Sequence, residues 1–267
     1  VTANWGNDNI SVLRNTSVPG VIDATSFATK VDFATGALPY ALAIADLDGD
    51  SKVDVVVVNR NDDSISTLLN TSTSGVIDAN SLAAKIDKST GIRPYAVAIG
   101  DLDDDGMADL AVVNYAQQNV SVFKNTSTGI GAISYSRMDF HTASSPSSVA
   151  IGDLDGDGKP DIAAGSLSGR VVSLFKNAST SGTIDASSFS SKTDISSGYY
   201  HTSVVLCDQD GDHKPDILVN NQTSNTFSVL RHTGSDTATD MTEFSFNEQT
   251  GEATIDAAAH TVDIEVE

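Results

Sequence analysis

Aspartate recurs at fixed spacing in four nine-residue segments of this 267-residue chain. Each segment has Asp at positions 1, 3, 5 and 9, and an apolar run follows directly. These residues are Asp46, Asp48, Asp50 and Asp54; Asp101, Asp103, Asp105 and Asp109; Asp153, Asp155, Asp157 and Asp161; and Asp208, Asp210, Asp212 and Asp216. Four carboxylates in one tight loop repel one another unless a cation neutralises them, and oxygen ligands at this density suit calcium. The sequence therefore predicts four calcium sites, one in each segment.

The EF-hand calcium loop opens in a similar way, but it requires a bidentate Glu at position 12 and a helix on either side. Here position 12 is apolar in every segment: Val57, Val112, Ala164 and Val219. Each of these residues lies in a strand-like apolar run. The EF-hand is therefore excluded, and the Asp at position 9 is expected to open a β-strand.

The Asp segments belong to a longer repeat. They begin at residues 46, 101, 153 and 208, and a second marker, an apolar stretch closing on a polar residue, keeps the same period. The closing residues are Asn15, Asn70, Asn125, Asn177 and His232. Self-similarity at about 50 residues indicates a solenoid, a propeller or an array.

Each unit reads as four short strands without helical periodicity. In the first complete unit these are Ala41–Ala45, Val55–Val58, Ile65–Leu69 and Lys85–Asp87, with the Asp segment between the first two. The second strand is apolar on both faces, so both of its faces must be covered. We therefore predict an all-β fold, a β-propeller built from four-stranded blades of about 52–55 residues, with calcium loops between strands 1 and 2.

The first strand of each unit closes on a small residue, which suits a crowded strand near the propeller axis. These residues are Ala45, Gly100, Gly152 and Cys207. Cys207 is the single cysteine of the chain and lies in an apolar run. We interpret it as a small core residue and not as a nucleophile.

The repeats divide the chain into two parts. Residues 1–235 form the propeller repeats, a half blade that opens at a third strand, Asn9–Leu13, followed by four whole repeats. Residues 236–267 depart from the period but still alternate as strands. The alternating stretches are Phe244–Phe246, Ala253–Asp256 and His260–Val266. This C-terminal segment is either the start of a following β-domain or a set of strands that completes a blade.

The Asp segments and their period resemble the FG-GAP/VCBS repeat family of β-propellers, which occurs in integrin α-chain heads and bacterial surface proteins. The resemblance covers residues 1–235. It implies side-chain calcium ligands at positions 1, 3, 5 and 9, and a backbone-carbonyl ligand at position 7 whose side chain points away from the ion. The position 7 residues are Lys52, Met107, Lys159 and Lys214. Position 6 is usually Gly, so Ser51 and His213 are expected to weaken calcium binding in the first and fourth segments.

The charge of the chain limits its partners. A formal net charge of -21 argues against nucleic acid and against anionic membrane surfaces. No apolar stretch is long enough for a membrane-spanning helix, so membrane insertion is not expected. The chain begins at Val1 without a basic and apolar leader, and we interpret it as a processed part of a longer secreted protein. An extracellular or cell-surface location is expected.

Three functions are compatible with these features. The first is a non-catalytic, calcium-stabilised adhesion or recognition module of a bacterial surface protein, with a glycan or protein ligand on one propeller face. The alternative is a structural subunit of an extracellular filament, in which copies of the chain complete one another's blades. The third is a carbohydrate-active enzyme on a propeller scaffold, ranked last because no catalytic motif is present.

Aromatic residues are the sequence's only hint of a glycan site. Several tyrosines and Trp5 could stack on sugar rings. Tyr40 and Tyr95, however, recur directly before the first strand of two units. Recurrence at the same place favours packing between blades as the role of these two rings.

Overall fold

The computed structural model describes residues 1–197, 200–223, 225–232, 241–247 and 252–255, which contain strands and turns but no helix. Five antiparallel sheets follow one another along the chain. Sheet 1 is β1 (Thr2–Asn4), β2 (Asn9–Val12) and β3 (Val31–Ala34). Sheet 2 is β4 (Pro39–Ala45), β5 (Asp54–Asn59), β6 (Ser64–Leu68) and β7 (Ile86–Ser89). Sheet 3 is β8 (Pro94–Gly100), β9 (Asp109–Asn114), β10 (Asn119–Asn125) and β11 (Tyr135–His141). Sheet 4 is β12 (Pro146–Gly152), β13 (Asp161–Ser166), β14 (Val171–Phe175) and β15 (Lys192–Ser196). Sheet 5 is β16 (His201–Cys207), β17 (Asp216–Asn221), β18 (Thr226–His232), β19 (Met241–Asn247) and β20 (Glu252–Ile255).

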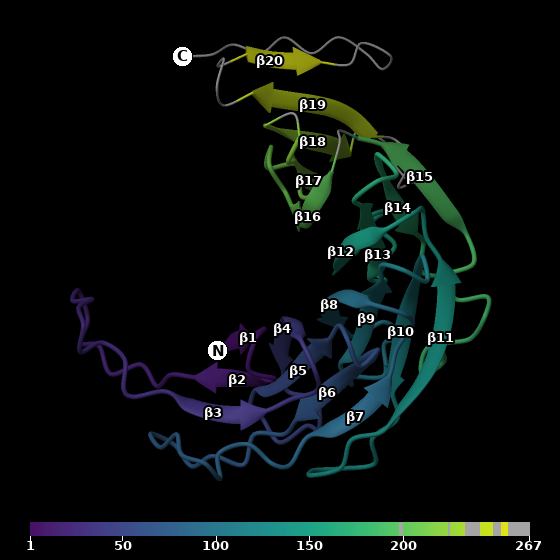
Figure 1. Cartoon of the computed structure of the whole chain (residues 1–267). Helices are drawn as coiled ribbons and strands as arrows, with labels where there is room; N and C mark the ends of the chain where they lie inside the picture. Colours follow the sequence, from purple (N-terminus) through teal and green to yellow (C-terminus); the bar gives the residue numbers. More distant parts are fainter. Residues whose placement is uncertain (198–199, 224, 233–240, 248–251, 256–267) are drawn as a thin grey trace.

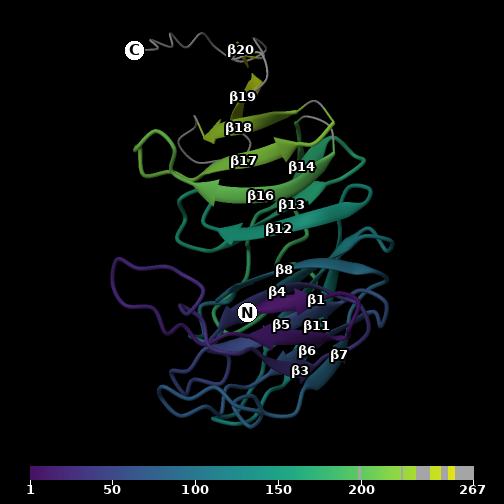
Figure 2. The ribbon, with the colours of Figure 1, turned by 60° about the vertical axis from the view of Figure 1, so that its left-hand side comes forward.

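The sheets are arranged as the blades of a β-propeller, which confirms the predicted fold class. Consecutive strands pair as meanders, and the sheets succeed one another along an open arc with sheets 1 and 5 at its two ends (Figure 1). The first strands of sheets 2 to 5, β4, β8, β12 and β16, contact one another in that order on the inside of the arc (Figure 2). We call these the inner strands.

The second strand of each blade holds neighbouring sheets together. Every residue of β5, β9 and β13 is buried. In β5, Val56 and Val58 pack with Leu110 and Val112 of sheet 3, whereas Val55 and Val57 pack with sheet 1 around Ile10. Alternate residues of one strand therefore face opposite neighbours, which explains why this strand is apolar on both faces.

The inner strands interlock through small residues. A Cβ on Gly100 would lie 2.9 Å from Ile151 Cγ2 of the next inner strand, and a Cβ on Gly152 would lie 2.9 Å from Leu206 Cδ1. The residue of β4 that is equivalent to Ile151 and Leu206 is Ile44. Among the described residues sheet 1 has no inner strand against which Ile44 could pack, and the Ile44 side chain is 54% exposed.

A buried asparagine at the end of the second strand links three strands of a blade. Asn59 donates through Nδ2 to Ser64 and Ser66, and its Oδ1 accepts the Gly36 amide at 3.1 Å. Ser66 in turn donates to Asp87 on the outer strand. Asn114 repeats this arrangement in sheet 3. The network satisfies polar groups that would otherwise be costly to bury.

The two ends of the arc differ from a standard repeat. The chain was expected to begin with the third strand of a blade, which is β2. The short strand β1 precedes β2 and pairs with it, so sheet 1 has three strands. At the other end, β19 pairs with β18 as the fourth strand of sheet 5, and β20 adds a fifth. Residues 256–267, which include the predicted stretch His260–Val266, lie outside the described residues.

Candidate metal centres

The four Asp segments form tight loops that connect each inner strand to the second strand of its blade. We call them loop 1 (46–54), loop 2 (101–109), loop 3 (153–161) and loop 4 (208–216). All four leave the same end of their inner strands, because each follows the last residue of the first strand. The four loops therefore lie on one face of the arc, which we call the loop face.

Each loop brings three carboxylates together. Their oxygens lie within 4.8 Å of one another. The groups are Asp46, Asp48 and Asp50 in loop 1; Asp101, Asp103 and Asp109 in loop 2; Asp153, Asp155 and Asp161 in loop 3; and Asp208, Asp210 and Asp216 in loop 4. The predicted carboxylate ligands that lie outside these groups are Asp54, Asp105, Asp157 and Asp212. The loops thus assemble the predicted carboxylates, with position 5 joining the group in loop 1 and position 9 in the others.

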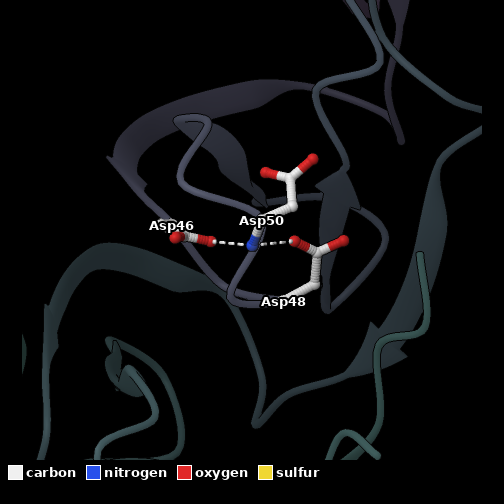
Figure 3. A group of neighbouring side chains, drawn as sticks. All are labelled: Asp46, Asp48 and Asp50. Atoms are coloured by element: carbon white, nitrogen blue, oxygen red, sulfur yellow. Dashed lines mark hydrogen bonds between the residues drawn. The ribbon is translucent and has the colours of Figure 1, made fainter. Parts of the chain in front are cut away.

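Backbone amides fold each loop around its first carboxylate. In loop 1, Asp46 accepts the amides of Gly49 (2.8 Å) and Ser51 (2.7 Å). The Asp50 amide points between Asp46 and Asp48, at 3.2 Å from an oxygen of each (Figure 3). These bonds orient the carboxylates toward one another before any ion is present, which is the preorganisation that a hard-cation site requires.

The tight turn requires left-handed backbone at positions 4 and 6. Position 6 has φ of 67° at Ser51 and 67° at His213, where the other two loops have Gly. Position 4 is Gly in three loops, but in loop 2 it is Asp104, with φ of 55°. The strain expected at Ser51 and His213 thus has a counterpart at position 4 of loop 2, where Asp104 replaces Gly.

The position 9 carboxylate ties its loop to the end of the third strand. Asp54 accepts the amide of Leu47 within the loop (2.9 Å) and that of Asn70 (2.7 Å). The same pair of bonds recurs at Asp109, Asp161 and Asp216. This carboxylate is therefore an organising residue of the loop as well as a candidate ligand.

Burial changes the acidity of these carboxyls. It raises the pKa of Asp109 to about 7 and that of Asp161 to about 6, and the pKa of Asp54 is also raised. The hydrogen bonds that Asp109 accepts from two backbone amides lower its pKa, whereas the nearby carboxylate of Asp103 raises it further. Negative charge is therefore concentrated and poorly solvated in these loops, and a divalent cation would relieve that cost.

A basic side chain from the third strand approaches three of the loops. Lys124 pairs with Asp103 and lies 2.5 Å from Asp105 Oδ2. Lys176 and Arg231 pair in the same way with positions 3 and 5 of loops 3 and 4. The equivalent residue beside loop 1 is the apolar Leu69. Sequence analysis missed these cations, although they stand directly before the closing residue of the repeat marker.

Asparagine at the closing position connects loops of neighbouring blades. Asn125 donates to the carbonyl of Leu47 in loop 1 (2.8 Å) and to Ala108 of its own blade (3.2 Å). Asn177 makes the same bridge to Leu102 in loop 2 (2.7 Å). In sheet 5 the position is His232, which is buried and whose ring nitrogens have no hydrogen-bond partner among the described residues. The loops are thus part of the contact between blades, and this contact is incomplete between sheets 4 and 5.

The donor set of loop 2 fits a hard cation. Asp103 is 1% exposed, and its Oδ1 has no hydrogen-bond partner in the part of the chain that the structure describes. A buried carboxylate oxygen without a partner is energetically costly unless a cation contacts it. Carboxylate oxygens are also the ligands that calcium prefers.

The position 7 residues behave less uniformly than the resemblance implied. Each donates its backbone amide to the position 5 carboxylate, as Lys52 does to Asp50 (2.8 Å). The Lys52 side chain does not point away from its loop, because Nζ lies 3.3 Å from Asp50 Oδ2. Lys159 does point elsewhere and donates to the carbonyl of Ser179 (2.6 Å). Because the residue that would approach loop 1 from the third strand is the apolar Leu69, no basic side chain from there competes with Lys52 for the Asp50 carboxylate.

Comparison with known proteins places these loops in a family. A family model described as "FG-GAP-like repeat" matches residues 46–112, 101–164 and 155–219, and each match starts inside one loop and ends in the second strand of the following blade. No curated protein matches the chain.

Solved structures with a similar arrangement are distant in sequence. They include a Lactobacillus plantarum protein (15% identity, TM-score 0.45, 85% of this chain and 58% of that one). A functionally unknown protein from Desulfotomaculum acetoxidans is similar at 12% identity (TM-score 0.44, 95% and 77%). The Vibrio cholerae biofilm matrix protein Bap1 is similar at 15% identity (TM-score 0.38, 80% and 38%). The chain thus spans less than two thirds of the first and third of these proteins. On the family match, which covers more than half of its length, the chain belongs to the FG-GAP-like repeat family.

Proposed function

We propose that this chain is a non-catalytic, calcium-stabilised recognition module of an extracellular or cell-surface protein. The FG-GAP-like repeats support an extracellular or surface repeat module. Among the described residues no helix is long and apolar enough to cross a membrane. The observation that carries the proposal is the preorganised group of three carboxylates in every loop, with the buried, unpartnered Asp103 oxygen in loop 2.

Calcium would be held by the Asp side chains at positions 1, 3, 5 and 9 of each loop and by the carbonyls of Lys52, Met107, Lys159 and Lys214. When bound, it neutralises carboxylates that otherwise repel one another. The loops also carry the contacts made by Asn125 and Asn177, so fixing a loop fixes the contact with the next blade. Calcium therefore has a structural role in this proposal, and it supports the surface that recognises a ligand.

The magnitude of the effect is appropriate for a structural ion. Extracellular calcium modules bind with Kd of roughly 10⁻⁴–10⁻³ M. At about 1 mM free calcium, each site then contributes roughly 0.4–1.4 kcal/mol, and four sites contribute roughly 2–6 kcal/mol. This is comparable with the net stability of a whole domain.

Thermal unfolding in 2 mM calcium and in excess chelator tests this proposal. We expect calcium to raise the unfolding midpoint by roughly 5–20 °C, given about 2–4 °C per kcal/mol for a chain of this size. Asp155→Asn should reduce the shift, because it removes one ligand charge from loop 3. Asp194→Asn, which makes the same charge change on the outer strand β15, is the matched control and should leave the shift intact. Equal midpoints with and without calcium would contradict the proposal.

A second candidate, a subunit of an extracellular filament, is favoured by one observation. In the described part of the chain sheet 1 has no inner strand, and Ile44 is more than half exposed where the equivalent Ile151 and Leu206 interlock with the preceding inner strand. An inner strand supplied by a second copy would cover it. Light scattering of the purified chain in calcium distinguishes the two candidates, because filament subunits would form large assemblies and a free module would have a mass of about 27.8 kDa.

A further inference from the structure

A cavity of about 370 Å³ lies at the end of the inner strands opposite the loop face. It is lined by residues at the starts of β4, β8, β12 and β16, so four blades contribute to it. Figure 2 shows these four strands side by side. Tyr40 and Tyr95 supply its aromatic lining, and Ser147, Ser148 and Ser203 supply hydroxyl groups among apolar side chains such as Leu167. Aromatic rings and hydroxyl groups in one lining make this cavity amphipathic.

The aromatic lining continues beyond the cavity as a connected cluster. Tyr40 and Tyr95 have ring centroids 4.4 Å apart, and their hydroxyls are hydrogen-bonded at 2.7 Å. Tyr115 stacks on Tyr95 at 5.6 Å, and Trp5, 57% exposed, meets Tyr40 edge-on at 6.2 Å. The recurring tyrosines therefore do pack across neighbouring blades, and all three remain partly exposed beside the exposed Trp5.

The backbone around the cavity is irregular in the same way in three blades. The ladder between the first and second strands skips Tyr40, Tyr95 and Ser147, each of which lies at a register shift. Each follows a proline, and the residue before that proline has positive φ although it is not Gly: Leu38 (57°), Arg93 (55°) and Ser145 (57°). Register shifts re-aim side chains, and strained backbone of this kind clusters at binding sites.

Two polar groups define the chemistry of the cavity. Ser148 is 7% exposed and lines the cavity, and its Oγ has no hydrogen-bond partner within the described segments of the chain. Arg60 places its guanidinium 5.1 Å from the ring centroids of both Tyr40 and Tyr95. Because Arg60 already supplies the cation for these rings, a cationic ligand is disfavoured there. The net charge of -21 disfavours a polyanion.

We infer that this cavity binds an uncharged pyranose ring of a glycan. The apolar face of such a ring stacks on tyrosine, while its hydroxyls can both donate to and accept from serine hydroxyls. Ser148 Oγ is a buried group that lacks a partner in the free protein, and a sugar hydroxyl provides one. This inference rests on the proposed recognition function, for which it supplies the site and the ligand class.

The test is calorimetric titration of the calcium-loaded chain with tetrasaccharides of glucose, galactose and mannose, alongside hexuronic acid tetrasaccharides. We expect saturable binding of at least one neutral tetrasaccharide and no preference for the charged ones.

Ser148→Ala should weaken that binding about fivefold, the equivalent of one hydrogen bond of about 1 kcal/mol. It removes a hydroxyl that has no partner in the free protein, so the fold should be unaffected. Tyr95→Ala should weaken binding about tenfold or more by removing a stacking ring.

Phe27→Ala is the matched control, because Phe27 is an exposed ring in the connector between β2 and β3. It should bind sugar as the unmodified chain does. The inference is overturned if no neutral tetrasaccharide binds, if hexuronates alone bind, or if Ser148→Ala and Tyr95→Ala both bind normally.

Thermal unfolding of the same samples distinguishes failure of the glycan site from failure of the calcium-stabilised module. A calcium-stabilised chain that binds no sugar contradicts only the glycan site, whereas a chain indifferent to calcium contradicts the calcium-stabilised module.

Discussion

Single residues in and beside the loops determine how well neighbouring blades are connected. Asn125 and Asn177 each donate two hydrogen bonds, one to their own blade and one to the loop of the preceding blade. His232 occupies the same position in sheet 5, is buried, and makes no side-chain hydrogen bond in the described structure. An unsatisfied buried group of this kind costs about 1–3 kcal/mol.

His232→Asn is therefore expected to stabilise the chain by about 1–3 kcal/mol, because the new amide can reach the carbonyls of Leu154 and Pro215. Chemical denaturation in calcium measures the change. The reverse substitution, Asn177→His, is the matched control and should destabilise the chain by a similar amount. A His232→Asn chain no more stable than the original would show that the ring nitrogens are not a source of instability.

The basic residues beside loops 2 to 4 compete with calcium for the same carboxylates. Lys176→Met should therefore raise the calcium affinity of loop 3 about fivefold, corresponding to about 1 kcal/mol for one exposed ion pair. Lys192→Met removes the same charge from a pair with Asp194 on the outer strand and should leave calcium affinity nearly unchanged. Calorimetric titration with calcium distinguishes the two. Equal effects of both variants would mean that Lys176 acts only through the overall charge.

At the scale of the strand, the inner strands depend on close contact between successive blades. Gly100→Ala should destabilise the chain by about 1–3 kcal/mol, because the new Cβ would lie 2.9 Å from Ile151 Cγ2. Gly6→Ala is the control, since a Cβ there meets nothing within 4 Å and its φ is not positive. Chemical denaturation of both variants checks the prediction. Equal stabilities would mean that the inner strands can separate without cost.

The order of apolar, polar and small residues along the sequence was sufficient to predict most strands. Each second strand is apolar on both faces, and each inner strand ends in a small residue. Contacts between distant residues were not predictable in this way. Asn59 reads as an ordinary polar residue at a strand end, yet it bonds to side chains of the third strand and to the Gly36 backbone. Lys124 was equally visible, but only the fold shows that its side chain crosses to the loop carboxylates.

At the scale of the whole molecule, repetition produces two faces with different chemistry. The loops leave one end of the inner strands and concentrate carboxylates there. The other end carries Tyr40 and Tyr95 and the hydroxyl-lined cavity. The sequence indicated the first face, because four ligand residues fall within nine positions. The second face is assembled from single residues of four blades, so no contiguous motif could reveal it.

The loop face makes the stability of the whole molecule depend jointly on calcium and pH. Burial raises the pKa of Asp109 to about 7 and that of Asp161 to about 6, from an ordinary value of 3.8. Between pH 3.8 and these values, the calcium-free folded chain holds protons that the unfolded chain releases. Its stability should therefore fall as pH rises through this window.

Calcium binds the deprotonated carboxylates, so its apparent affinity should rise over the same pH range and its binding should release protons. The gap between the unfolding midpoints with and without calcium should therefore be large at pH 8 and small at pH 5. Thermal unfolding at the two pH values measures this gap, and calorimetry in buffers of different ionisation enthalpy measures the released protons. Since Asp109 lies in loop 2, whose Leu102 carbonyl accepts the Asn177 bond from the next blade, acidification would weaken the calcium-dependent connection between sheets 3 and 4. An identical gap at both pH values would mean that protons and calcium do not compete for these carboxylates.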